Sequence, residues 1–246
     1  MCFSATASFT AGTALTVVGV LTVSKSQGKR ELPLALIPLL FGVQQLTEGV
    51  VWVGLGHDLG LLQTWATYVY SMFSHVVWPI LVPFAILLVE PRLWRRKAIS
   101  VFVALGLSVG LYLLFFIVRF PVTASVRGHS ISYDSPHFYS AVVLVVYLLA
   151  TCISGLFSSH WCINVFGVLA FVLAIGAAVV SITTFVSVWC FFAAILSLLV
   201  YVHFSGPMQA CRHMLAPTRV QDHLPTPTTP SPPPPPLSTH PVRPSP

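Results

Sequence analysis

Charged residues are scarce in this chain of 246 residues: Asp, Glu, Lys and Arg together make up 7% of it. Soluble domains are roughly one-quarter charged, so a soluble fold is excluded. In place of charge, the chain has 56% hydrophobic residues and a mean hydropathy of +0.86. Apolar runs of roughly 20 residues recur along it, which is the length a helix needs to cross a bilayer. The sequence therefore predicts an all-α, polytopic helical bundle of the cell membrane, surrounded by the lipid bilayer.

Several motifs are also missing. The twelve Lys and Arg residues exceed the six Asp and Glu residues, but they stand in short loops beside apolar runs, where they act as topology signals. We therefore expect no nucleic-acid partner. The five cysteines lack the spacing of a disulfide framework or a metal motif. Without a Walker motif, a dinucleotide fingerprint or a haem-attachment motif, nothing favours ATP-driven pumping or nicotinamide chemistry. No cleavable signal peptide is expected, since no basic residue precedes the first apolar run.

The apolar runs predict seven transmembrane helices. Their ranges are 3–23, 32–55, 65–89, 98–118, 138–157, 161–180 and 184–204. The last two come from one run, which we divide at 181–183 because no helix needs twice the bilayer thickness. Six spans are the alternative. With seven, only Arg119 and Arg127 fall opposite the other basic residues. The positive-inside rule then places the N-terminus outside and the C-terminus in the cytoplasm.

The composition changes after residue 204. The segment 205–246 holds thirteen of the twenty prolines, including the run 232–236. Such a segment has too little apolar surface to fold and favours extended polyproline II structure. We therefore divide the chain into a transmembrane domain, 1–204, and a disordered proline-rich cytoplasmic tail, 205–246. The tail is a candidate ligand for a proline-recognition domain.

The second span carries polar residues in its interior. Gln44 and Gln45 precede Glu48 by four and three residues, so all three lie on one helix face. A carboxylate in the hydrocarbon region costs roughly 2.5–3.5 kcal/mol on insertion scales, so it normally has a partner and a use. Glu48 is therefore the candidate titrating or liganding group, with Gln44 and Gln45 as its hydrogen-bonding partners. The alternative is a structural hydrogen bond to another helix.

The predicted topology brings further reactive side chains to the outer half of the bundle. Besides Glu48, they are His75, Cys190, Cys2, His129 and His137. His75 precedes Pro79, which has no N–H to donate to the His75 carbonyl, and a kinked helix of this kind often borders a polar cavity. His75 is therefore a second candidate ligand, and Cys190, Cys2, His129 and His137 would complete or gate the site.

Carboxylate, imidazole and thiolate groups suit a borderline metal such as zinc or copper. Removal of Met1 would give Cys2 a free α-amine beside its thiol, a pair that chelates soft metals or acts as a nucleophile. No tight motif such as HExxH or CxxC accompanies these residues. The metal therefore remains one alternative beside a small ligand or a proton.

Several segments resemble an uncharacterised bacterial family of multi-pass membrane proteins. The N-terminal sequence MCFSATASF resembles the signature of that family. Further matching segments are 31–33, 38–41, 44–45, 48–52, 73–75, 135–139 and 187–192. The resemblance extends over residues 1–204 and implies a multi-pass membrane protein. It implies no activity, because none is established for the family.

Three functions follow as alternatives. The first is a small-ligand, metal-ion or proton site used for transport or sensing. The second is a membrane-embedded lipid hydrolase, since the spacing of Ser71 and His75 resembles that of seven-helix metal-dependent hydrolases related to alkaline ceramidases. Those enzymes carry paired histidines in the last span, where this chain has only His203, so the sequence favours a protein that is not an enzyme. The third is a structural or accessory membrane protein.

Overall fold

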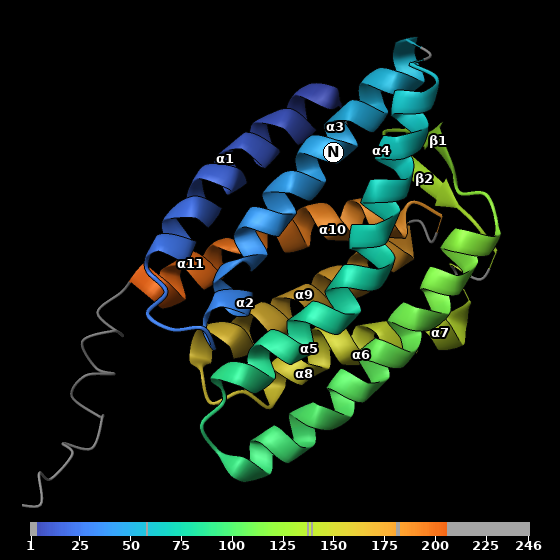
Figure 1. Ribbon diagram of the computed structural model, residues 1–246. Coiled ribbons are helices and arrows are strands. Elements are labelled where there is room, and N and C mark those ends of the chain that lie inside the picture. The colour runs from blue at the N-terminus through green and yellow to red at the C-terminus, as the bar shows by residue number, and fades with distance from the viewer. Residues whose placement is uncertain (1–3, 58, 137, 139, 181–182, 206–246) are drawn as a thin grey trace, which may run out of the picture.

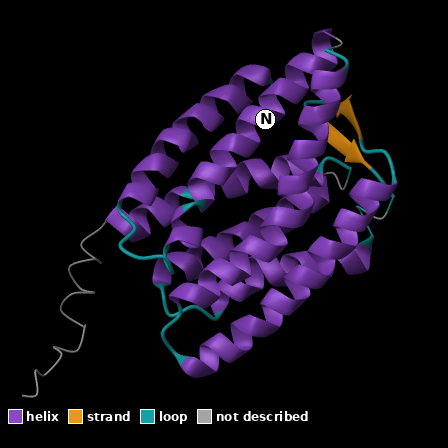
Figure 2. Ribbon diagram, viewed as in Figure 1, coloured by secondary structure: helices purple, strands orange, loops and turns teal. Residues whose placement is uncertain are grey.

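The computed structural model describes residues 4–57, 59–136, 138, 140–180 and 183–205. Cys2, His137 and all but the first residue of the expected proline-rich tail lie outside these residues. The described chain is a bundle of long helices with one small hairpin at its edge (Figure 2). Its helices are α1 (Ala5–Ser24), α2 (Leu32–Ala35), α3 (Ile37–His57), α4 (Leu61–Met72), α5 (Trp78–Val89), α6 (Leu93–Arg119), α7 (Ala141–Leu148), α8 (Ser154–Leu156), α9 (Trp161–Val180), α10 (Phe185–Leu196) and α11 (Leu198–Ser205).

Six helical segments are long and apolar enough to cross a membrane. They are Ala5–Ser24, Leu32–His57, Leu61–Val89, Leu93–Arg119, Trp161–Val179 and Phe185–Ser205. Each overlaps one of the expected spans, and a shorter apolar helix, Ala141–Leu156, overlaps the remaining one. The expectation of an all-α bundle of apolar helices compatible with a membrane is therefore confirmed, with six helices of sufficient length among the described residues.

Two short π-helical turns interrupt the helices. The first, η1 (Phe73–Val77), joins α4 to α5, and the second, η2 (Leu149–Ile153), joins α7 to α8. In η1 the Trp78 N–H donates to the Phe73 carbonyl, five residues back. The next donor in that register would be residue 79, but it is proline and has no N–H. The carbonyl of Ser74 is therefore freed, and the Tyr147 hydroxyl of α7 donates to it at 2.5 Å.

The connection between α6 and α7, which the sequence suggested was a polar loop, is instead a β-hairpin. Strands β1 (Thr123–Arg127) and β2 (Ser130–Asp134) pair antiparallel, with Arg127 opposite Ser130. Gly128 opens the two-residue turn with φ of +62°, a conformation that glycine adopts without strain. Most of β2 is buried, and Ser132 donates to the Thr183 carbonyl at 3.1 Å. The hairpin thus packs against the end of the bundle (Figure 1).

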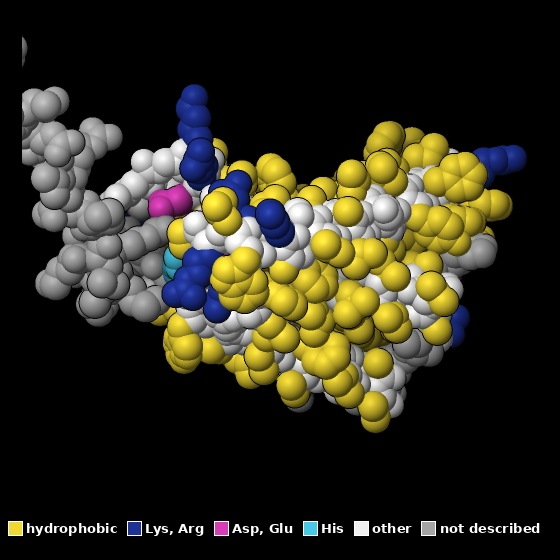
Figure 3. All heavy atoms as spheres, turned by 90° about the horizontal axis from the view of Figure 1, so that it is seen from below, with side chains coloured by type: hydrophobic (Ala, Val, Ile, Leu, Met, Phe, Trp, Pro, Cys, Tyr) yellow, Lys and Arg dark blue, Asp and Glu magenta, His cyan; other side chains and the backbone are white. Residues whose placement is uncertain are grey.

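We call this end of the molecule the hairpin end and the opposite one the basic end. The basic end contains residues 25–31, 90–92 and 157–160. There the Glu90 carboxylate accepts hydrogen bonds from the Ser159 N–H and hydroxyl, both at 2.6 Å, and from the Arg92 N–H at 3.2 Å. Arg95 donates to the carbonyls of Phe157 and Ser158. Lys and Arg side chains gather at one end of the face drawn in Figure 3, beyond a hydrophobic middle.

Close packing of helices depends on two groups of glycines. Along the contact of α1 with α3, a Cβ atom at Gly12 or Gly42 would lie 2.8 Å or less from atoms of the facing helix. In α6, a Cβ at Gly106 would collide with the carbonyl oxygen of Pro79. Small residues at such positions let helix backbones approach closely in membranes. These contacts hold α1 against α3 and α6 against α5.

Candidate functional site

Glu48 lies at the centre of the bundle and is fully buried. Its Oε1 accepts a hydrogen bond from the Ser187 hydroxyl of α10 at 2.6 Å, and its Oε2 accepts one from Gln45 Nε2 at 3.3 Å. The Tyr70 side chain of α4 also lies beside this carboxyl group. Gln45 precedes Glu48 by three residues, so helical periodicity alone sets their contact. The carboxyl group thus joins α3 to α10, beside α4.

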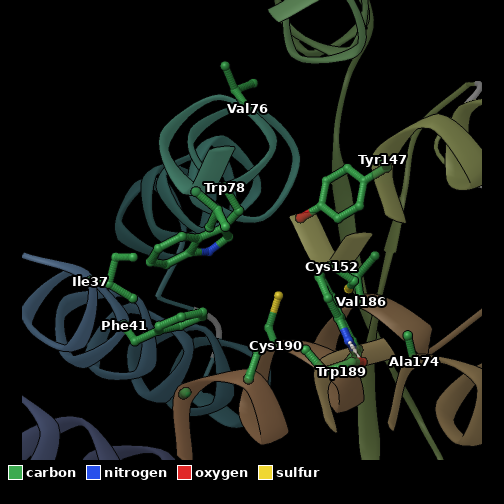
Figure 4. Packing of buried hydrophobic residues seen from close by; sticks show 14 of the residues in the cluster. Ile37, Phe41, Val76, Trp78, Tyr147, Cys152, Ala174, Val186, Trp189 and Cys190 are labelled. Atoms are coloured by element: carbon green, nitrogen blue, oxygen red, sulfur yellow. Dashed lines mark hydrogen bonds between the residues drawn. The ribbon is translucent and has the colours of Figure 1, made fainter. Parts of the chain in front are cut away.

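Gln44 and Cys190 extend this polar centre. Gln44 Oε1 accepts a hydrogen bond of 2.6 Å from Trp78 Nε1, and the Trp78 ring stacks on Phe41 with centroids 3.8 Å apart. The Cys190 thiol lies beside Gln44, Glu48 and Tyr70. In Figure 4 its sulfur points into the space between Trp78 on one side and Tyr147 on the other. Gln44, Gln45 and Glu48 are thus all buried on one helix, as their spacing predicts, but only Gln45 bonds to Glu48, because Gln44 is bonded to Trp78 instead.

Among the residues that the structure describes, only neutral side chains hydrogen-bond to the Glu48 carboxyl group. Within the described residues, the one salt bridge joins Arg127 to Asp134 at 3.6 Å, on the exposed hairpin. No cationic side chain of the described part of the chain lies within 4.0 Å of Glu48. An uncompensated carboxylate in a low-dielectric interior is costly. Among the described residues, nothing compensates a negative charge on this carboxyl group.

His75 lies on η1 and is also buried, with 3% of its surface exposed. Its Nδ1 lies 2.8 Å from the Ser74 hydroxyl and 3.2 Å from the Ser71 carbonyl oxygen. Its ring stacks on Phe138, with centroids 3.8 Å apart. No hydrogen bond or ion pair joins His75 to Glu48 in the part of the chain that the structure describes. The two side chains belong to neighbouring regions of the core rather than to one ligand shell.

The residues proposed for a metal do not form a cluster where the structure describes them. Residues 4–57, 59–136, 138, 140–180 and 183–205 contain no group of three or more His, Cys, Asp or Glu side chains that could hold a metal ion. Cys190 lies beside Glu48, while His129 is exposed in the hairpin turn. Cys2 and His137 fall outside the described residues. The donors that remain do not fit a zinc or copper centre.

The serine and histidine of the hydrolase hypothesis are not arranged as a dyad. The Ser71 hydroxyl is buried and has no hydrogen-bond partner among the described residues. His75 instead contacts the backbone carbonyl of Ser71. A nucleophilic serine needs its hydroxyl within hydrogen-bond reach of the base. The geometry therefore lends no support to serine chemistry at this position.

Three residues of the core were missed from the sequence: Ser187, Tyr70 and Tyr147. Ser187 precedes Cys190 by three residues, so both lie on one face of α10. Tyr70 stacks on Tyr133 of β2, with centroids 4.3 Å apart, so the hairpin covers this side of the polar centre. Helical periodicity from Cys190 would have found Ser187. The contact of Tyr70 depends on the hairpin, which the sequence did not reveal.

A comparison with protein families assigns the chain to a family of unknown function. A model of the family of unknown function DUF6629 matches residues 1–214. The chain belongs to this family. The match extends beyond residue 204, the expected end of the transmembrane domain, and α11 also continues to Ser205. No curated protein and no solved structure matches the chain.

Proposed function

We propose that this protein crosses the cell membrane seven times and that Glu48 reversibly binds a proton or a small cation for transport or sensing. The observation that carries the proposal is the fully buried Glu48 carboxyl group, surrounded by neutral hydrogen-bond donors with no cationic partner among the described residues. Such a group is stable when it carries a proton or a cation in place of a salt-bridge partner. It can then release and rebind that proton or cation as an ion gradient or a signal changes.

Seven crossings are supported by the path of the shorter helix. Ser159, which follows α8, bonds to Glu90 at the end of α5. The segment that begins in α7 near the hairpin therefore reaches the basic end, although α7, η2 and α8 together are short. Exposed tryptophans near helix ends, Trp65 on one side and Trp94 and Trp161 on the other, suit the two interfaces of a bilayer. The excess of basic residues at the basic end favours its cytoplasmic location.

The proton is the first ligand to test, because it needs no space beyond the carboxyl group. The full chain would be reconstituted into lipid vesicles, and infrared difference spectra would be recorded across a pH titration. We expect a carboxyl band that changes reversibly with pH and is absent from Glu48→Gln, which keeps the shape of the side chain but cannot exchange a proton. Glu31→Gln is the matched control, since that carboxylate lies at the basic end and accepts the Gln27 N–H.

Proton flux into the same vesicles separates transport from sensing. Transport requires flux in wild type and its loss in Glu48→Gln, whereas sensing requires reversible protonation without flux. A carboxyl band that is insensitive to pH, together with equal flux in both proteins, would overturn the proposal. Glu48 would then serve only to tie α3 to α10, as a structural or accessory membrane protein requires.

A further inference from the structure

A small cavity lies beside His75, and Glu48 is not among the residues that line it. Its volume is about 20 Å³, enough for about one water molecule. Four aromatic side chains, Phe138, Tyr147, Phe185 and Trp189, line it together with His75 and aliphatic residues such as Leu144. None of the lining residues is Asp, Glu, Lys or Arg. The cavity is therefore apolar apart from the imidazole and two hydroxyl-bearing residues.

The hydrogen bonds around His75 define which ring nitrogen carries the proton. The Ser74 hydroxyl has its own acceptor, the Tyr70 carbonyl oxygen, at 3.0 Å. The Ser71 carbonyl oxygen, 3.2 Å from Nδ1, can only accept. Both neighbours are satisfied when Nδ1 carries the proton and donates to them. With Nδ1 bare, the Ser71 oxygen would face a lone pair at 3.2 Å, and the Ser74 hydroxyl would have to abandon Tyr70.

Nε2 is then an acceptor with a free lone pair. It is buried and has no hydrogen-bond partner among the described residues. Because Nδ1 is turned toward the backbone of its own helix, the Nε2 edge of the ring points away from that helix, and His75 is part of the cavity wall. A buried polar atom without a partner is costly, so it is normally satisfied by a protein group or a bound molecule.

We infer that this cavity is a second binding site, separate from Glu48, for one neutral hydrogen-bond donor of the size of water or ammonia. The bound molecule donates to His75 Nε2 and lies against the aromatic side chains of the wall. Its size is limited by the cavity volume of about 20 Å³. Its neutrality follows from the lining, which offers no carboxylate to compensate a cation. The inference does not rest on the function proposed for Glu48.

Solid-state NMR of the full chain in lipid bilayers tests this site, with the histidine ring nitrogens isotope-labelled. The His75 signals are identified by their loss in His75→Gln. We expect Nδ1 to be protonated, Nε2 to be bare, and magnetisation to pass from water to the Nε2 edge of the ring. Leu144→Phe should fill the cavity and abolish this transfer while the tautomer stays unchanged. Leu148→Phe, one turn further along the same helical segment and outside the lining, should leave both unchanged.

Labelled ammonia, added at alkaline pH, distinguishes the two donors. A contact between its nitrogen and His75 Nε2 identifies ammonia as a ligand, whereas contact with water alone identifies water. The inference is overturned if Nε2 is protonated in wild type. It is also overturned if Nε2 is bare but receives no magnetisation from either donor. The tautomer is read from wild type itself, so the test does not depend on the folding of any variant.

Discussion

At the scale of single residues, the bond between Ser187 and Glu48 is central because it joins two helices that are far apart in the sequence. Ser187 Oγ donates to Glu48 Oε1 at 2.6 Å, and both side chains are fully buried. The neighbouring bond from Gln45 lies within α3 and needs no tertiary structure. Loss of the Ser187 hydroxyl therefore removes an interhelical contact, while the local one persists.

We expect Ser187→Ala to lower the free energy of unfolding by roughly 1–3 kcal/mol, since a buried carboxyl oxygen loses a donor. Ser197→Ala is the matched control: Ser197 is equally buried, but its hydroxyl donates to the carbonyl of Ala194 in its own helical turn. Denaturant or thermal unfolding in detergent measures both. Equal losses in the two variants would mean that the bond to Glu48 contributes no more than a local one.

Glu90 makes the stability of the contacts at the basic end depend on pH. Burial alone would raise the pKa of this carboxyl group, but the hydrogen bonds from Ser159 and Arg92 and the nearby His160 outweigh it and hold the pKa below its ordinary value. A carboxylate whose folded-state pKa is lowered stabilises the fold above its unfolded pKa of about 4.5 and loses that effect as pH falls through the folded pKa. The contacts at this end therefore weaken in acid.

Glu90→Gln should accordingly be less stable than wild type near neutral pH, and the difference should shrink as pH falls below about 4.5. Thermal unfolding of the purified protein across this range measures the difference. Glu31→Gln removes another carboxylate from the same end and controls for a general change in charge. A gap between Glu90→Gln and wild type that stays constant into acid would show that the Glu90 contacts do not depend on its ionisation.

At the scale of elements, helices were predictable and their irregularities were not. Runs of apolar residues defined where the helices lie, because spanning a bilayer leaves little choice of backbone structure. The hairpin was missed because β1 and β2 are each 5 residues long and carry polar residues between two apolar runs. Pro79 correctly marked the irregular part of its helix. The π turn, however, could not be foreseen. It frees the carbonyl of Ser74, which accepts a hydrogen bond from the Tyr147 hydroxyl.

Gly106 provides a test of the packing between elements. A Cβ atom there would meet the Pro79 carbonyl oxygen, an atom of backbone that cannot rotate away. Gly106→Ala should therefore destabilise the protein by roughly 1–3 kcal/mol or prevent its folding. Gly176→Ala, in α9, has no atom within 4 Å of the new Cβ, so it should be neutral or slightly stabilising. Similar thermal stability of the two alanine variants would contradict this close approach.

At the scale of the whole molecule, the sequence predicted part of the candidate site. Gln44, Gln45 and Glu48 were predictable because one helix sets their relative positions. Their partners Ser187 and Tyr70 come from other helices, and an apolar pattern does not specify how helices rotate against one another. For the same reason His75 was expected beside Glu48, yet its hydrogen bonds go to its own helix. Helical periodicity thus predicted which residues share a helix face, and tertiary packing determined which helix faces contact one another.

The orientation in the membrane is the remaining prediction at this scale. In a protein with Cys2 and Cys211 replaced by serine, single cysteines would be introduced at His129, Lys29 and Ser159. All three positions are exposed, and the described native cysteines are buried. On intact cells, a membrane-impermeant maleimide should label His129→Cys, whereas Lys29→Cys and Ser159→Cys should react only after permeabilisation. The cysteine-depleted parent protein is the control.

Labelling of Ser159→Cys from outside would favour six crossings over seven, because the segment from α7 to α8 would then return to the hairpin side. Protection of His129→Cys with labelling of Lys29→Cys would reverse the orientation derived from the basic residues.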